Sequence, residues 1–164
     1  MSHSLFCFAG SIGLKYYALG DIIIILTFGP VSVLFAYIVQ CGEMSLYPLV
    51  CAIPLVMNTE AILHGNNTRD IKSDTQSGVL TLAILLGFKF SYLLYFILII
   101  SPYLIVFGLV IKLSISFILP LSTIPYALCL EKDFRFGKLA KIPQDTAKLN
   151  CLFGLMYIGA FLLS

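Results

Sequence analysis

The chain has 164 residues, of which 60% are hydrophobic and only 11% are charged. A soluble domain carries about a quarter charged residues, and here the apolar residues come in long blocks rather than at alternating or heptad positions. This composition excludes an ordinary soluble domain, and the lack of a basic-aromatic array excludes a nucleic-acid-binding protein. It predicts an all-α, multi-pass transmembrane helical bundle, with residues 1–164 forming a single membrane domain.

Five apolar blocks are candidates for membrane-spanning helices. A helix needs about 20 mainly apolar residues to cross the hydrocarbon core. Four blocks have this length, and the fifth reaches it if its helix begins near Thr146 or the bilayer thins. In chain order the predicted spans are Ile22–Gln40, Met44–His64, Tyr92–Ile111, Leu113–Leu130 and Leu149–Leu163. The predicted partner of most of the surface is therefore the lipid bilayer.

The basic residues lie almost entirely on one side of these five spans. Only Lys112 falls on the other side. The nine on the first side are Lys15, Arg69, Lys72, Lys89, Lys132, Arg135, Lys138, Lys141 and Lys148. Because loops rich in Lys and Arg stay in the cytosol, the sequence predicts that the connections 65–90 and 131–147 are cytosolic.

The longer cytosolic connection contains a second apolar run that is too short to span. This run, "SGVLTLAILLG", ends with Gly87 and carries Gly78 near its start. We interpret it as a short helix over the mouth of the membrane domain, either a lid over a site or an idle interfacial helix. The connection 131–147 carries basic residues that suit anionic lipid headgroups.

The second predicted span ends in an unusually polar stretch, "HGNNTRDIKSD". If the helix continues past Gly65, the side chains of Glu60, His64, Asn67, Asp70 and Asp74 fall within an arc of about 120°. Carboxylates at the membrane edge are costly and usually functional. Oxygen-only ligands suit Mg²⁺, which typically joins one or two carboxylates to substrate phosphates. The stretch therefore predicts half of a metal–diphosphate site.

The same stretch has a plainer interpretation as a solvated helix end with the pairs Arg69–Asp70 and Lys72–Asp74. On the helical wheel Arg69 and Lys72 point away from the acidic face, which favours headgroup anchors. Lys15 is better placed to neutralise a diphosphate, although it too could be an anchor.

One longer stretch resembles a known family. "NNTRDIKSDTQSGVLTLAILLG" is similar to the second aspartate-rich motif and lid of the UbiA-type intramembrane prenyltransferases. The segments "GLKYYALGD", "TFGPVSVLFAYIVQ" and "KIPQDTAKLN" resemble the menaquinone-forming branch. The resemblance implies a nine-helix fold around a central cavity, with two aspartate-rich motifs that hold Mg²⁺ and a prenyl diphosphate. It also implies geranylgeranyl transfer to a naphthoquinone acceptor, giving menaquinone-4 (vitamin K2).

Carried over residue by residue, this resemblance implies roles for seven positions. Asp70 and Asp74 correspond to metal ligands with a catalytic role, and Asn67 to a further metal ligand. Lys15 corresponds to a basic catalytic residue that faces the diphosphate. By their place in or beside the motif, the residues expected at the substrate are Asn66, Asn67, Arg69 and Lys72.

The first aspartate-rich motif of the family, of the type Asn-Asp-x-x-x-Asp, is absent from this sequence. We therefore expect the chain to correspond to the C-terminal half of the fold and to be inactive by itself. The alternative is a non-catalytic membrane interaction or regulatory protein built from that half. A small transporter is a third interpretation, for which inverted repeats would be needed. We expect an endoplasmic reticulum or Golgi membrane, with a mitochondrial membrane as the alternative, and the sequence predicts no oligomeric state.

Overall fold

The computed structural model describes residue 23 and residues 25–164, and every regular element in this part of the chain is a helix. The longer helices are α3 (Ser32–Cys41), α4 (Tyr47–Arg69), α6 (Leu82–Lys112), α8 (Ile124–Arg135) and α9 (Ile142–Leu162). The shorter elements are η2 (Thr27–Val31), α5 (Ile71–Gln76), η3 (Ile115–Phe117), α7 (Ile118–Leu121) and η4 (Leu139–Lys141). The prediction of an all-α membrane bundle is confirmed.

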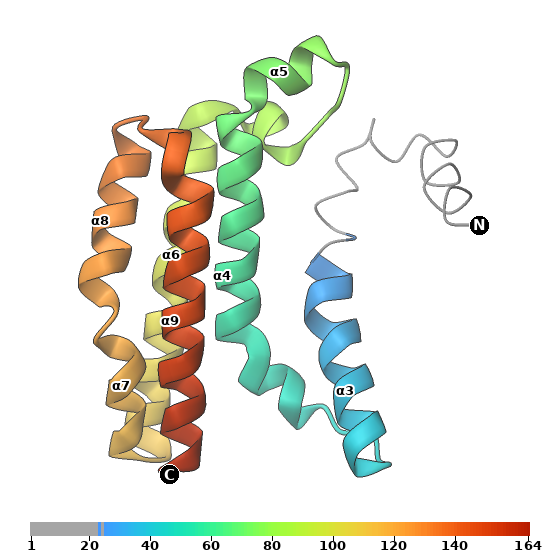
Figure 1. Ribbon diagram of the computed structural model, residues 1–164, viewed down its shortest axis with the longest axis vertical. Helices are drawn as coiled ribbons and strands as arrows, with labels where there is room; N and C mark the ends of the chain where they lie inside the picture. The colour runs from blue at the N-terminus through green and yellow to red at the C-terminus, as the bar shows by residue number, and fades with distance from the viewer. Residues whose placement is uncertain (1–22, 24) are drawn as a thin grey trace.

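The helices stand roughly side by side, with α4 in the middle of the bundle (Figure 1). One side of α4 packs against α6 and α9, and its other side meets η2 and α3. The α7–α8 segment covers α6 and α9 on the side away from α3. Gly29 of η2 lies against Val56 of α4, where an added Cβ would be 3.1 Å from a valine methyl carbon. The small residue therefore permits the close approach of these two helices.

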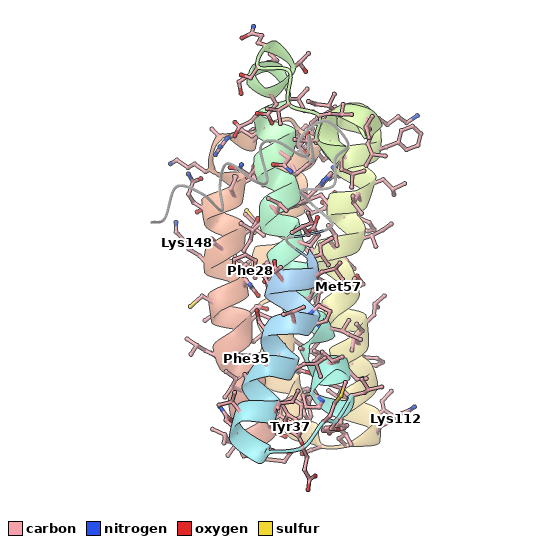
Figure 2. All side chains as sticks on the ribbon, turned by 90° about the vertical axis from the view of Figure 1, so that its right-hand side faces the viewer. Phe28, Phe35, Tyr37, Met57, Lys112 and Lys148 are labelled. Carbon is pink, nitrogen blue, oxygen red and sulfur yellow. The ribbon has the colours of Figure 1, made fainter. Side chains whose placement is uncertain are left out.

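The two ends of the bundle differ in charge, as the loop assignment predicts. The turn between α3 and α4, the turn after α6 and the C-terminus lie at one end (Figure 1). The segment containing α5 and the connection between α8 and α9 lie at the other. Figure 2 shows Lys112 at the first end, whereas Lys148 lies in the opposite half of the molecule. We call the end that carries α5 and η4 the basic end.

The predicted spans overlap the observed helices, but the ends of some helices and the continuity of one differ from the prediction. Three segments are long and apolar enough to cross a membrane within the described residues: Tyr47–Arg69, Leu82–Lys112 and Ile115–Arg135. The fifth predicted span lies inside α9, which begins earlier, at Ile142, with Pro143 in its first turn. Thr27–Cys41, in the first predicted span, is a shorter apolar helix. The number of five spans therefore stays a prediction.

The fourth predicted span is not one continuous helix. It breaks at Ser122–Thr123, between α7 and α8, in a stretch that contains Pro120 and Pro125. A break at membrane depth is tolerated only where other groups satisfy the freed backbone. Here the Thr123 hydroxyl donates to the Pro120 carbonyl at 2.7 Å and also meets the Tyr103 hydroxyl of α6 at 2.8 Å. The interhelical contact thus stabilises the break.

The short apolar run before the third span also forms a helix. Residues Leu82–Leu86 are helical, and at Gly87 the backbone takes φ 66° and ψ 169°, which separates them from the long part of α6. This positive φ favours glycine, because a Cβ in this conformation would come too close to the backbone of its own residue. The run is thus a distinct helical turn beside the membrane mouth, and its role as a lid stays a prediction.

The core on the basic half of the bundle is organised around the side chain of Tyr95. Its ring stacks on that of Phe134 of α8, with centroids 4.1 Å apart. Its hydroxyl hydrogen-bonds the Thr146 hydroxyl of α9 at 2.7 Å. A Cβ on Gly65 of α4 would be 3.7 Å from the Tyr95 ring. One α6 side chain therefore contacts three neighbouring helices.

We predict that Tyr95→Phe lowers the free energy of unfolding by about 1 kcal/mol, in the range of interhelical hydrogen bonds in membranes. The substitution keeps the ring stack and leaves the buried Thr146 hydroxyl without its partner. SDS-induced unfolding of the purified protein in mixed micelles measures the change. Tyr126→Phe is the control, since no hydrogen bond of the Tyr126 hydroxyl is found among the described residues. Equal stability of Tyr95→Phe and wild type would contradict the prediction.

We also predict that Ser77 is cytosolic and Ser164 luminal. In a variant whose native cysteines are replaced, a cysteine at Ser77 should react with an impermeant maleimide in intact microsomes. A cysteine at Ser164 should react only after the membrane is opened. The reverse pattern would show that the positive-inside assignment is wrong.

Candidate functional site

The polar stretch begins on a part of α4 that is buried between neighbouring helices. The helix continues past Gly65 to Arg69, as the helical wheel requires. An added Cβ on Gly65 would lie 3.0 Å from a methyl carbon of Ile142, so α4 and α9 are in close contact at this level. Asn67 and Thr68 are buried, whereas Asn66 is half-buried. The packing of α4 therefore determines the direction in which the last helical turn presents its polar residues.

The Arg69 side chain joins Asn66 to Asp70 across the last turn of α4. Its Nε donates to Oδ1 of Asp70 at 2.8 Å, and its Nη2 donates to Oδ2 at 2.6 Å. The same Nη2 donates to Oδ1 of Asn66 at 2.8 Å. The guanidinium holds the pKa of Asp70 below its usual range, mainly through this hydrogen bonding. The expectation that Arg69 points away from the acidic residues is therefore wrong, because the side chain folds back over its neighbour.

Asp74 lies one turn beyond Asp70 and is in a different electrostatic state. The Asp74 backbone N–H donates to the Asp70 carbonyl at 2.9 Å, so the i, i+4 relation is kept. Partial burial raises the pKa of the Asp74 carboxyl, and the negative charge of Asp70 raises it further. Among the described residues no ion pair reaches Asp74, and the Lys72–Asp74 pair does not form. One carboxylate of the two is thus neutralised by Arg69, and the other is open to a cation.

Glu60 and His64 do not join the aspartates in one cluster. His64 is buried, and its Nε2 lies 3.0 Å from the Ser91 carbonyl of α6, which makes it a contact between helices. Asp70 departs from helical geometry, with φ −96° and ψ 8°, and ends α4. The following helix α5 leans away above the bundle (Figure 1). The described residues contain no group of three His, Cys, Asp or Glu side chains that could hold a metal ion, so Glu60 and His64 do not complete a metal cluster with the two aspartates.

Comparison with known proteins identifies the family. The model of the UbiA prenyltransferase family matches residues 4–159. The chain belongs to the UbiA prenyltransferase family. It is 55% identical over 161 residues to UbiA prenyltransferase domain-containing protein 1 of Danio rerio, covering 98% of this chain and 48% of that protein. The Homo sapiens protein of the same name is 54% identical over 159 residues, covering 97% and 47%.

A Drosophila melanogaster homolog is 48% identical over 158 residues, covering 96% of this chain and 44% of the homolog. The chain thus spans about half the length of the curated relatives it matches. Together with the apolar helices, membership of the UbiA family makes it an integral membrane protein.

The residues of the UbiA motif fit a partial magnesium site. Asp70, Asp74 and Asn67 offer only oxygen ligands, which Mg²⁺ prefers, and Mg²⁺ often uses only one or two carboxylates with substrate phosphates as the remaining ligands. The repulsion between Asp70 and Asp74 is the kind of feature that a bound cation relieves. The assignment of these three residues as ligands stays a prediction. Lys15 lies outside the described residues.

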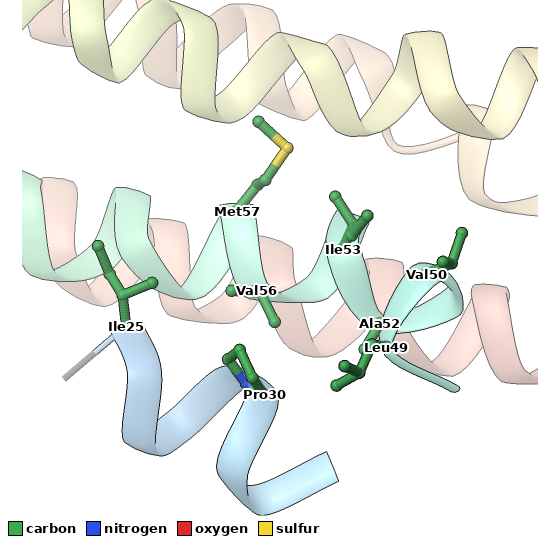
Figure 3. A pocket seen from close by; sticks show the side chains of 8 residues that line it. All are labelled: Ile25, Pro30, Leu49, Val50, Ala52, Ile53, Val56 and Met57. Carbon is green, nitrogen blue, oxygen red and sulfur yellow. The ribbon is translucent and has the colours of Figure 1, made fainter. Parts of the chain in front are cut away.

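Two mainly apolar grooves lie beside α4. One, of about 230 Å³, lies between η2 and α4 and is entirely apolar (Figure 3). Figure 3 shows Ile25, Pro30 and Val56 facing the space between the two helices. The other, of about 310 Å³, includes Asn66 and Pro143 beside the apolar Phe28, Ile62 and Leu63. The second groove therefore connects an apolar space to the polar end of α4.

The plainer interpretation of the stretch included the Arg69–Asp70 pair, which is confirmed, but the contact between Arg69 and Asn66 was not predicted. A signal for it was present, because residues three apart share a helix face, and Asn66 and Arg69 have this spacing. The analysis also missed Glu131, a buried carboxylate of α8 that accepts a hydrogen bond of 2.6 Å from the Tyr92 hydroxyl. No periodic pattern marks that contact, since it joins residues far apart in the chain.

We predict that Arg69→Gln raises the pKa of Asp70 towards its usual range. Asp70 now has a lowered pKa, so it stabilises the fold at neutral pH, and this contribution is lost as the pH falls through its folded-state pKa. The pair is about a third exposed, so we expect less than about 1 kcal/mol from it. Carboxylate NMR of ¹³C-labelled aspartate measures the pKa directly. Lys72→Gln should leave it unchanged, and an unchanged pKa in Arg69→Gln would contradict the prediction.

Proposed function

We propose that this chain forms half of the active site of a Mg²⁺-dependent prenyltransferase, which transfers a geranylgeranyl group from its diphosphate to a naphthoquinone and so makes menaquinone-4. The observation that carries the proposal is the carboxylate pair Asp70 and Asp74, one turn apart at the end of a membrane helix. The match to the UbiA family over residues 4–159 supports the reaction class. The donor, the acceptor and the metal come from the resemblance.

In this proposal the protein residues hold and orient the charged end of the donor. Asp70, Asp74 and Asn67 would hold Mg²⁺, and the ion would supply positive charge for the diphosphate leaving group. Arg69 keeps the Asp70 carboxylate ionised and in one orientation through its bidentate hydrogen bonds. Charge that develops on a leaving group is stabilised best by groups already in place. Lys15 would add a positive charge at the same diphosphate.

The hydrocarbon chain of the donor needs an apolar groove from which water is excluded. The groove that includes Asn66 and Phe28 begins at the motif and is lined elsewhere by Ile62, Leu63, Pro143 and one polar residue, Thr59. A prenyl chain is a flexible hydrocarbon, and apolar burial drives its binding. The short helical turn before Gly87 lies beside the motif in sequence and would exclude water as a lid. These assignments place the ionised head and the hydrocarbon tail in different environments.

We predict that Asp70→Asn and Asp74→Asn each slow prenyl transfer about a hundredfold, equivalent to about 3 kcal/mol, as for the loss of one preorganised electrostatic contact. Each change keeps the shape of the side chain and removes a charge that Mg²⁺ needs. The assay uses a chimera in which the rest of the human relative is joined to this chain. Transfer of a radiolabelled geranylgeranyl group to the naphthoquinone is followed over a Mg²⁺ titration.

Thermal stability near that of the parent chimera is the control for folding. Activity of both variants at the parent level would show that the motif is a solvated helix end. A parent chimera that folds but transfers no prenyl group would favour the alternative, a non-catalytic interaction or regulatory protein. The presence of only two carboxylates in the described part of the site is the observation that keeps this alternative open.

A further inference from the structure

The basic end carries more positive charge than its acidic residues neutralise. Four ion pairs form there: Arg69–Asp70 at 2.6 Å, Arg135–Glu131 at 3.6 Å, Lys138–Asp133 at 3.7 Å and Lys148–Asp145 at 2.7 Å. Within the described part of the chain, the lysines at this end that form no ion pair are Lys72, Lys89, Lys132 and Lys141. They come from α5, α6, α8 and η4. The excess charge is thus spread over the whole end face rather than gathered at one point.

Two hollows on this face share a wall formed by Gly137, Leu139 and Ala140. The first, of about 580 Å³, is also lined by Arg69, Lys72 and Phe88. The second, of about 400 Å³, is also lined by Lys138 and Lys141 together with Asp133 and Asp145. Because Arg69 and Lys138 are held in ion pairs, Lys72 is the free cation of the first hollow and Lys141 that of the second, among the described residues.

The acidic groups do not cancel these two charges. Neither Asp70 nor Asp74 lines either hollow. Asp133 and Asp145 do line the second, but Lys138 and Lys148 neutralise them. The face therefore presents two exposed ammonium groups, those of Lys72 and Lys141, beside exposed aromatic rings. Phe88 is 43% exposed in the first hollow, and Phe136, 65% exposed, precedes the loop.

We propose that the face around the Gly137–Lys141 loop binds the headgroup of an anionic phospholipid, with Lys72 and Lys141 as its principal contacts. Ammonium groups at a membrane edge attract acidic lipids, and exposed phenylalanine rings can insert at the boundary between headgroups and acyl chains. A prenyl diphosphate fits this face less well, because neither Asp70 nor Asp74, the proposed metal ligands, lines the two hollows. The spread of free lysines over four elements also suits a lipid layer better than one small ligand. This assigns Lys72 to lipid rather than to substrate.

The test measures binding of phosphatidylserine and phosphatidylcholine to the purified chain in detergent by native mass spectrometry. We expect phosphatidylserine to bind more tightly. Lys72→Gln and Lys141→Gln should each weaken it about fivefold, and the double variant about twenty-five-fold, as expected for one basic contact each. Lys112→Gln, at the opposite end of the same bundle, is the matched control and should change nothing. High salt should weaken the binding of phosphatidylserine and leave that of phosphatidylcholine unchanged.

Three results would overturn the proposal. Equal binding of the two lipids by the wild-type protein would show that no headgroup site exists, and this comparison needs no variant. Equal losses in Lys112→Gln and Lys72→Gln would show a general charge effect. Displacement of phosphatidylserine by geranylgeranyl diphosphate with Mg²⁺ would place Lys72 in the substrate site instead. Circular dichroism of each variant confirms that its helical content is intact.

Discussion

The contacts of Tyr95 hold together the half of the bundle that carries the candidate site. Its ring stacks on Phe134, its hydroxyl meets Thr146, and its edge faces Gly65. In a bilayer, apolar side chains gain little by leaving lipid for one another, so helices associate through close packing and shared hydrogen bonds. Tyr95 packs against α4 and α8 and hydrogen-bonds to α9. The direction in which α4 presents Asn66, Arg69 and Asp70 depends on this packing.

Small residues and prolines have a consistent use in this fold. Gly29 and Gly65 stand where a neighbouring helix comes close, and Gly87 stands where the backbone needs a positive φ. Pro120 and Pro125 flank the break in the Ile115–Arg135 segment, where the hydroxyls of Thr123 and Tyr103 satisfy nearby groups. Each irregularity therefore lies at an interhelical contact or at the membrane edge, where the backbone can be satisfied.

Among the described residues, the positively charged ones at the basic end are of two kinds, those held in ion pairs and those that form none. Arg69 is committed to Asp70 and Asn66 and so belongs to the aspartate motif. Lys72, three residues later, forms no ion pair with any described residue and lines a hollow that Arg69 also lines but neither aspartate does. Lys72 is separated from the α4 part of the motif because α4 ends at Asp70, where the chain changes direction and α5 leaves the axis of α4. In our two proposals, Arg69 therefore serves the aspartate motif and Lys72 serves the membrane surface.

The sequence alone was enough to predict a helical membrane protein, the end at which each loop lies, and the family. These features depend on long apolar blocks, on the one-sided distribution of Lys and Arg, and on a local motif. Each of these can be identified from the sequence without knowledge of the tertiary structure. The sequence could not predict that His64 bonds to Ser91 of α6, that Arg69 also bonds to Asn66, or that α4 ends at Asp70. The ideal helical wheel assumes unbroken geometry, whereas these outcomes depend on what α6 and α9 place beside α4. Only the tertiary structure decided which polar residues of the stretch became packing contacts and which remained open to a ligand, because burial between helices removes some side chains from water and leaves others at the edge.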